Sequence, residues 1–292
     1  MKYESGAAFR RALEDRLRTM SLETGIPLVR LRKMVAFDHF LARLFLHRPD
    51  QWVVKGGFAL QLRLGAGART TKDIDLLVLG EVQDIFPHLR EAGAIKLGDW
   101  FGFEVMDTIG SNAEDIGGLR YRIHTLLDGR TFERFHIDIG IGDPLLAPVE
   151  YLETPALLTF AGIASTTVPC YPIVQQIAEK YHAYTRPHVS GASSRVKDFA
   201  DILLLAEMGE IDSLNLRKAI RATFDDCKTH ELPISVPLPS KNWSLPFQKM
   251  AIEVELKFKS LSDAGAALQQ FLDPALETEA QKSWNSIKWR WE

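Results

Sequence analysis

Residues 53–80 read VVKGGFALQLRLGAGARTTKDIDLLVLG, and this stretch decides the fold. A short apolar run precedes a Gly-Gly pair, and a second run, DIDLLV, carries two aspartates one residue apart. Side chains two residues apart on a strand point to the same face, so we expect Asp73 and Asp75 together, with Ile74 and Leu76 facing the core. Adjacent carboxylates repel each other, which predicts a divalent cation with oxygen ligands, Mg2+ or Mn2+, between them.

A third carboxylate occurs on a later predicted strand. Residues 135–141, FHIDIGI, alternate with period two, and Asp138 lies on the face opposite the apolar side chains. If this strand neighbours the one at 74–79, three carboxylates converge, which is the set that two Mg2+ ions need for an in-line phosphoryl displacement. The alternative is that each aspartate is a solvated residue on an edge strand, because single motif matches are often accidental.

Gly56 and Gly57 stand between the first predicted strand and a helix expected from Phe58 to Leu64. Without a Cβ the backbone can approach a ligand, and the N–H groups at a helix start face an anion such as a triphosphate. A plain tight turn is the alternative reading. The segment lacks the Gly-Lys-Ser/Thr of a Walker loop, and GAGAR at 65–69 does not fit a dinucleotide fingerprint.

Two charged residues lie on predicted helices of the C-terminal half. Lys180, on a helix expected over 172–185, lies at the edge of an apolar stripe, where its ammonium reaches either water or a cleft between domains. Asp198 falls in the first turn of a helix expected from residue 194, where the helix dipole favours a carboxylate regardless of function. With Arg195 and Lys197 it would form a charged cluster at the mouth of a cleft.

The periodicity of apolar residues divides the chain into three regions. Residues 1–50 are expected to be helical, with a break at Gly25 and Pro27. Residues 51–150 alternate short strands with helices, among them a helix expected over 81–92 and a strand over 119–127. Residues 151–292 are expected to be mostly helical, with one helix over 245–258, and to complete the active-site cleft. The fold class is therefore α/β (α+β).

The composition of the chain limits the classes of protein to which it can belong. The chain of 292 residues is 46% apolar, which is ample for a core, and its net charge of -3 argues against a generally basic nucleic-acid binder, although a local basic groove stays open. No apolar run approaches the ~20 residues of a membrane span, so we expect a cytoplasmic protein without a membrane partner. The eight histidines show no paired spacing and are interpreted as ordinary surface or core residues.

Five segments taken together resemble the AbiEii-type nucleotidyltransferase toxins, which include the mycobacterial MenT proteins. They are KGGFAL at 55–60, RTTKDIDL at 69–76, HID at 136–138, EKYHA at 179–183 and RVKDFADI at 195–202. The family belongs to the DNA polymerase β-like nucleotidyltransferase superfamily. The resemblance implies a polymerase β-like core with a mixed sheet, N-terminal helices and a C-terminal helical domain.

The resemblance also implies roles for individual residues. The catalytic residues that the resemblance implies are Asp73, Asp75, Asp138, Lys180 and Asp198. Those that bind the nucleotide would be Gly56, Gly57, Arg69, Lys72 and Lys180. The aspartates that would hold the metal ions are Asp73, Asp75 and Asp138.

The activity that the resemblance implies is that of a toxin of a type IV toxin-antitoxin system, paired with a winged-helix antitoxin of the AbiEi type. We expect Mg2+-dependent transfer of a nucleoside monophosphate from an NTP to an acceptor hydroxyl, the 3′ end of a tRNA, which would block translation. One alternative is modification of a protein or small molecule, as by the antibiotic-type adenylyltransferases. Another is a non-catalytic nucleotide-binding protein.

Overall fold

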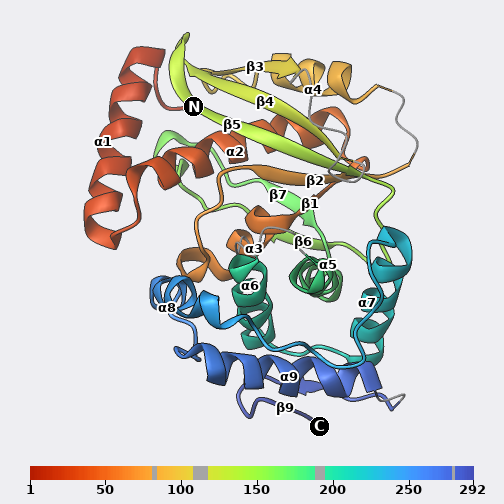
Figure 1. Ribbon diagram of the computed structural model, residues 1–292. Coiled ribbons are helices and arrows are strands. Elements are labelled where there is room, and N and C mark those ends of the chain that lie inside the picture. The colour runs from red at the N-terminus through yellow and green to blue at the C-terminus, as the bar shows by residue number, and fades with distance from the viewer. Residues whose placement is uncertain (81–83, 108–117, 188–194, 278–279) are drawn as a thin grey trace. The chain divides into compact units, whose positions relative to one another are not determined.

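The computed structural model describes residues 1–80, 84–107, 118–187, 195–277 and 280–292 (Figure 1). The chain folds into two compact units. The first comprises Met1–Gly142 and Val149–Cys170, and the second comprises Asp143–Pro148 and Tyr171–Glu292. No helix within the described ranges is both long enough and apolar enough to cross a membrane.

A mixed sheet forms the centre of the first unit. Its strands among the described residues are β1 (Trp52–Lys55), β2 (Ile74–Val78), β3 (Phe101–Asp107), β4 (Gly118–Leu127), β5 (Arg130–Ile141), β6 (Glu150–Glu153) and β7 (Thr167–Cys170). They lie in the order β3-β4-β5-β2-β1-β7-β6. The pairs β2·β5 and β1·β7 are parallel and the other neighbours are antiparallel, which confirms the predicted mixed sheet and fold class.

Four α-helices of the described chain belong to this unit: α1 (Gly6–Thr24), α2 (Leu28–His47), α3 (Gly56–Leu64) and α4 (Ile85–Ala94). The predicted break after the first helix is confirmed, because Gly25 adopts φ 72 and its N–H caps the carbonyl of Ser21. α2 packs against β5 and α4, and α4 packs against β3. Phe37 of α2 contacts the rings of Phe58 and Phe135 edge-on, with centroids 5.1 and 4.8 Å away, and so joins helix and sheet in one core.

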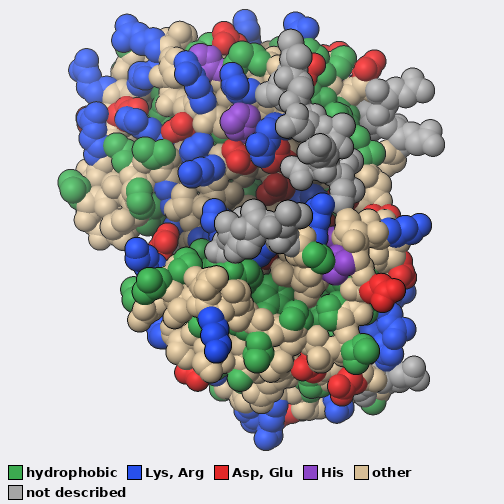
Figure 2. Space-filling view, viewed as in Figure 1, with side chains coloured by type: hydrophobic (Ala, Val, Ile, Leu, Met, Phe, Trp, Pro, Cys, Tyr) green, Lys and Arg blue, Asp and Glu red, His purple; other side chains and the backbone are tan. Residues whose placement is uncertain are grey.

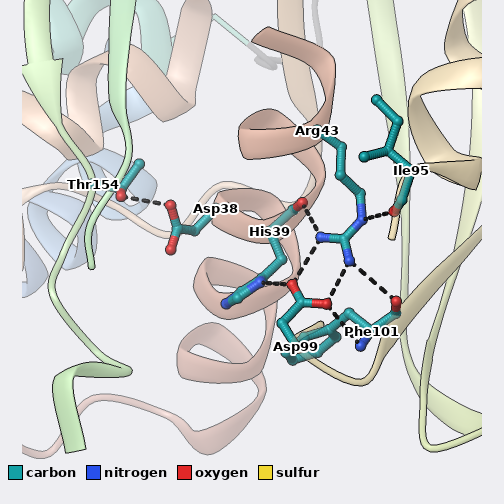
Figure 3. A network of polar contacts seen from close by, with 7 residues as sticks. All are labelled: Asp38, His39, Arg43, Ile95, Asp99, Phe101 and Thr154. Atoms are coloured by element: carbon teal, nitrogen blue, oxygen red, sulfur yellow. Dashed lines mark hydrogen bonds and ion pairs between the residues drawn. The ribbon is translucent and has the colours of Figure 1, made fainter. Parts of the chain in front are cut away.

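A buried ion-pair network fixes α2 to the segment between α4 and β3 (Figure 3). Fully buried Arg43 donates to both oxygens of Asp99, at 2.9 and 2.5 Å, and to the carbonyls of Ile95 and Phe101. His39 Nδ1 lies 2.6 Å from Asp99 Oδ2. Burial alone would raise the pKa of Asp99, but the hydrogen bonds of His39 and Arg43 outweigh it and lower that pKa well below its usual range.

The second unit is mainly helical, as predicted. Its helices in the described residues are α5 (Ile173–Thr185), α6 (Val196–Glu207), α7 (Ser213–Cys227), α8 (Ser244–Glu253) and α9 (Leu261–Glu277), followed by the short pair β8 (Trp284–Asn285) and β9 (Arg290–Trp291). α5 packs against α6 and α7, and α9 contacts α6, α7 and α8. The indole N–H of Trp284 donates to the carbonyl of Ala206 at 2.8 Å, which ties the C-terminal hairpin to α6.

Three local expectations differ from the structure. α8 ends at Glu253 instead of continuing to residue 258, because Glu255 adopts the left-handed φ of 53 that stops a helix. The helix expected over 81–92 runs from Ile85 to Ala94, and residues 81–83 lie outside the described chain. β6 and β7 were not predicted, because each has four residues and β7 contains Pro169, which reads as a strand breaker.

Candidate active site

The first unit brings the three predicted carboxylates to one part of the sheet. β2 and β5 are neighbouring parallel strands, and Asp75 stands opposite Asp138 in their register. Neighbours in register point to the same face, so these two side chains share a face, and Asp73 immediately precedes β2. The side chains of Asp73 and Asp138 are each 32% exposed, which leaves them accessible to a ligand. The two strands are therefore neighbours, which is the condition predicted from the sequence for the three carboxylates to converge.

Hydrogen bonds orient two of these carboxylates. Asp73 Oδ1 accepts the backbone N–H of His136 at 3.3 Å and lies 3.4 Å from His136 Nδ1. Asp75 Oδ2 accepts the backbone N–H of Gly57 at 3.3 Å, at the N-terminus of α3. The positive end of the α3 dipole thus faces the carboxylate of Asp75.

The Gly-Gly pair lies at the junction of β1 and α3, and both glycines are required sterically. Gly56 adopts φ 63, and a Cβ built on it would overlap the carboxylate of Asp75. A Cβ on Gly57 would lie 2.8 Å from Thr71 Oγ1 and 3.8 Å from the guanidinium of Arg69. The glycines therefore let α3 approach the carboxylate site closely, and Arg69 lies beside them.

The other predicted cation of this segment, Lys72, has an exposed side chain. Its backbone carbonyl accepts a hydrogen bond from Lys33 Nζ at 3.1 Å, so α2 holds the loop that leads into β2. Figure 2 shows many Lys and Arg side chains on the side of the first unit that is turned to the viewer, with acidic side chains among them.

Arg120 is a site residue that sequence reasoning missed. It lies on β4 opposite Asp138 of β5, and its Nε and Nη2 donate to the two carboxylate oxygens, each at 2.6 Å. The hydrogen bond to Asp138 and the negative charges of Asp138, Asp73 and Asp75 outweigh the effect of burial and raise the pKa of Arg120. The only signal in the sequence was a basic residue on the polar face of the strand at 119–127, and its partner depends on strand register.

The donor set of this site fits a divalent cation. Three carboxylates offer the hard oxygen ligands that Mg2+ and Mn2+ prefer, and the bidentate guanidinium shows that this face attracts positive charge. Within the described residues, the three aspartates do not bring their oxygens all within 4.8 Å of one another. A cation held by all three would therefore require their oxygens to move closer together.

The second unit holds the other two predicted catalytic residues, and it brings them together. Lys180 Nζ on α5 lies 2.9 Å from Asp198 Oδ1 and 3.0 Å from Asp201 Oδ2, both on α6. Arg195 Nη1 lies 3.2 Å from the other oxygen of Asp198, as the expected charged cluster requires, whereas Lys197 is exposed. Asp201, fully buried, was not predicted; its spacing of three from Asp198 was the available signal.

Comparisons with known proteins identify the family of the chain. The family model described as "Nucleotidyl transferase AbiEii toxin, Type IV TA system" matches residues 39–287. This match over most of the chain identifies a nucleotidyltransferase, a class of enzyme that generally uses an NTP and a divalent metal ion. The chain belongs to the AbiEii family of nucleotidyltransferase toxins, which confirms the resemblance found in the sequence and implies an antitoxin partner.

The solved structure of a nucleotidyltransferase toxin shows a similar fold. MenT4, a nucleotidyltransferase toxin from Mycobacterium tuberculosis H37Rv, is similar with a TM-score of 0.63 and 20% identity, over 94% of this chain and 92% of that one. JHP933 from Helicobacter pylori matches with a TM-score of 0.45 and 16% identity, over 84% of this chain and 94% of that one. A search of curated proteins gives no match.

Proposed function

We propose that this protein transfers a nucleoside monophosphate from an NTP to the 3′-hydroxyl of a tRNA in an Mg2+-dependent reaction, and that the added nucleotide blocks translation. The observation that carries the proposal is the pairing of Asp75 with Asp138 on adjacent parallel strands, with Asp73 next to them. In this reaction the hydroxyl oxygen bonds to the α-phosphorus, the bond to the β-phosphate breaks, and pyrophosphate leaves.

The residues of the first unit would have different roles at the reacting phosphate. Asp73, Asp75 and Asp138 would hold the metal ions, which neutralise the charge that develops on the phosphoryl oxygens. Asp138 would also accept the proton of the attacking hydroxyl. The amides of Gly56 and Gly57 would face the triphosphate.

Cations would bind the triphosphate and the RNA backbone. Lys180 would contact the triphosphate, with Asp198 positioning its ammonium, as their 2.9 Å contact supports. Arg69 and Lys72 would lie beside the phosphates. Because an RNA backbone is bound by displacing counterions, tRNA binding should weaken as the salt concentration rises.

The toxin would act in the cytoplasm, where NTPs and tRNA are found, and a winged-helix antitoxin of the AbiEi type would be its partner. Membership of a type IV toxin-antitoxin family supports an antitoxin partner, and the winged-helix identity of that partner is part of our proposal.

The test is to incubate the protein with total tRNA, Mg2+ and each α-labelled NTP separately, and to separate the products on a denaturing gel. Asp75→Asn is the inactive variant, and Asp15→Asn, a 66% exposed carboxylate on α1, is the matched control. Label on tRNA with the wild type and the control, and none with Asp75→Asn, supports the proposal. Label on a protein or small molecule in cell lysate, with none on RNA, overturns the tRNA assignment and favours the adenylyltransferase alternative.

A further inference from the structure

We propose that His47, His88 and Glu91 form a second metal site, for a transition-metal ion of the Zn2+ class. His47 is the last residue of α2, and His88 and Glu91 lie three residues apart on α4, so both α4 side chains share one helix face. α2 and α4 pack against each other in the first unit, which brings the three side chains together.

The distances between the three side chains suit one shared ion. Glu91 Oε2 lies 3.2 Å from His47 Nε2 and 3.8 Å from His88 Nδ1, and all three ligand atoms lie within 4.8 Å of one another. With metal-ligand bonds of about 2.1 Å, two ligands of a tetrahedral ion lie about 3.4 Å apart. The observed distances lie close to this value, and Glu91, whose side chain is 60% exposed, is able to adjust.

The imidazole nitrogens are otherwise unsatisfied. His47 Nε2 and His88 Nδ1 are both buried atoms without a hydrogen-bond partner in the described part of the chain, although Glu91 is near. Buried polar atoms are nearly always paired with protein, water or an ion, so two such atoms near one carboxylate require an explanation. The rings are tilted by 44° with centroids 5.9 Å apart, so they do not stack. A metal ion between them would satisfy both nitrogens at once.

The ligand chemistry separates this site from the carboxylate site. Two imidazoles and one carboxylate suit Zn2+, Co2+ or Ni2+, whereas the all-oxygen set of Asp73, Asp75 and Asp138 suits Mg2+ or Mn2+. An ion at the new site would join the end of α2 to α4 and, by binding the folded state alone, would stabilise the first unit. The inference does not rest on the proposed transfer reaction.

The experiment is a calorimetric titration of chelator-treated full-length protein with Zn2+ in excess Mg2+, which competes at the carboxylate site. We expect one Zn2+ ion per chain, with an affinity reduced at least tenfold in His47→Ala and in His88→Ala. His124→Ala is the matched control, because His124 Nδ1 also lies near a glutamate, Glu104 Oε2 at 3.0 Å. The control should bind Zn2+ as the wild type does, and Zn2+ should raise the Tm of both. Unchanged affinity in both alanine variants overturns the proposal.

Two further measurements need no variant and so do not depend on folding of the substituted chains. X-ray absorption at the zinc edge should show two imidazole nitrogens and no sulfur; sulfur ligands would instead assign the ion to Cys170 or Cys227 and overturn the proposal. Zn2+ should also protect His47 and His88, and not His124, from modification by diethyl pyrocarbonate, as mapped by mass spectrometry. Equal modification of all three with and without Zn2+ would contradict the site.

Discussion

Arg120 holds Asp138 by two parallel hydrogen bonds, Nε to Oδ1 and Nη2 to Oδ2, each 2.6 Å long. This bidentate contact joins β4 to β5 at the point where β5 meets β2. A guanidinium on this carboxylate supplies positive charge to a face that also carries Asp73 and Asp75. We expect a metal ion at the site to compete with Arg120 for Asp138.

Replacing Arg120 should strengthen metal binding. Arg120→Gln removes the positive partner of Asp138 and leaves that carboxylate available, so the affinity for Mn2+ should rise about threefold to tenfold, as partly exposed charge-assisted hydrogen bonds allow. The measurement is Mn2+ titration followed by electron paramagnetic resonance. Arg122→Gln, on the same strand, is the control and should bind Mn2+ as the wild type does. An unchanged affinity in Arg120→Gln would show that the guanidinium and the metal do not compete.

Gly56→Ala should abolish transfer through a displaced carboxylate. The new Cβ overlaps Asp75 and forces a left-handed φ on alanine, which costs about 1–2 kcal/mol in backbone strain alone. The control is Gly129→Ala, where φ is 71 and no atom lies near the new Cβ, so it carries the strain without the overlap. We expect the control to lose stability and keep nucleotide transfer, and Gly56→Ala to lose both. Equal transfer rates in the two variants would rule out the steric role assigned to Gly56.

Asp201→Asn should destabilise the second unit. It removes a fully buried carboxylate 3.0 Å from the Lys180 ammonium, and loss of one partner of a buried ion pair costs about 3 kcal/mol. Urea unfolding measures the loss. Asp263→Asn, an exposed carboxylate in the first turn of α9, should change the free energy of unfolding by less than about 1 kcal/mol. If Asp201→Asn leaves the free energy of unfolding unchanged, the buried carboxylate adds nothing to the stability of the second unit.

Stability of the second unit should fall on acidification. Burial, followed by the charges of His230, Arg186 and Arg195, lowers the pKa of His182 to about 4, and its Nε2 lies 2.8 Å from Thr229 Oγ1. The unfolded chain takes up this proton near its ordinary pKa of about 6.5, so the contribution is complete above that pH and is lost as the pH falls towards 4.

Between pH 7 and pH 5 this corresponds to a loss on the order of 2 kcal/mol in the free energy of unfolding. The fall in stability of the second unit should be clearly smaller in His182→Gln and unchanged in His124→Gln, because His124 lies on β4 of the first unit. His230, whose pKa burial also lowers, adds to the same fall. A steeper fall in His182→Gln than in the wild type would reverse the assigned sign.

The sequence predicts most of this fold because its signals are local. Period-two alternation predicts β2 and β5 and places Asp75 and Asp138 on their polar faces, and helical periodicity predicts α5 with Lys180 at the edge of its apolar stripe. What it does not predict depends on partners distant in the chain. Arg120 meets Asp138 only through the register of β4 against β5.

The pairing of His47 with His88 also depends on residues that are distant in the chain. The spacing of His88 and Glu91 is readable along one helix, but His47 joins them only because α2 packs on α4. β6 and β7 escape prediction although β1 is equally short, because no Gly-Gly turn follows them and β7 contains Pro169.

The parallel pairing of β2 with β5 has a consequence for the time at which the toxin becomes active during its own synthesis. Parallel strands need a long crossover, and here the connection contains α4, β3 and β4. Asp75 leaves the ribosome well before Asp138, and the two cannot meet until β5 has emerged. Lys180 follows later still. A ribosome-bound chain that ends before β5 therefore carries no assembled carboxylate site, and under the transfer reaction proposed above it would have no activity.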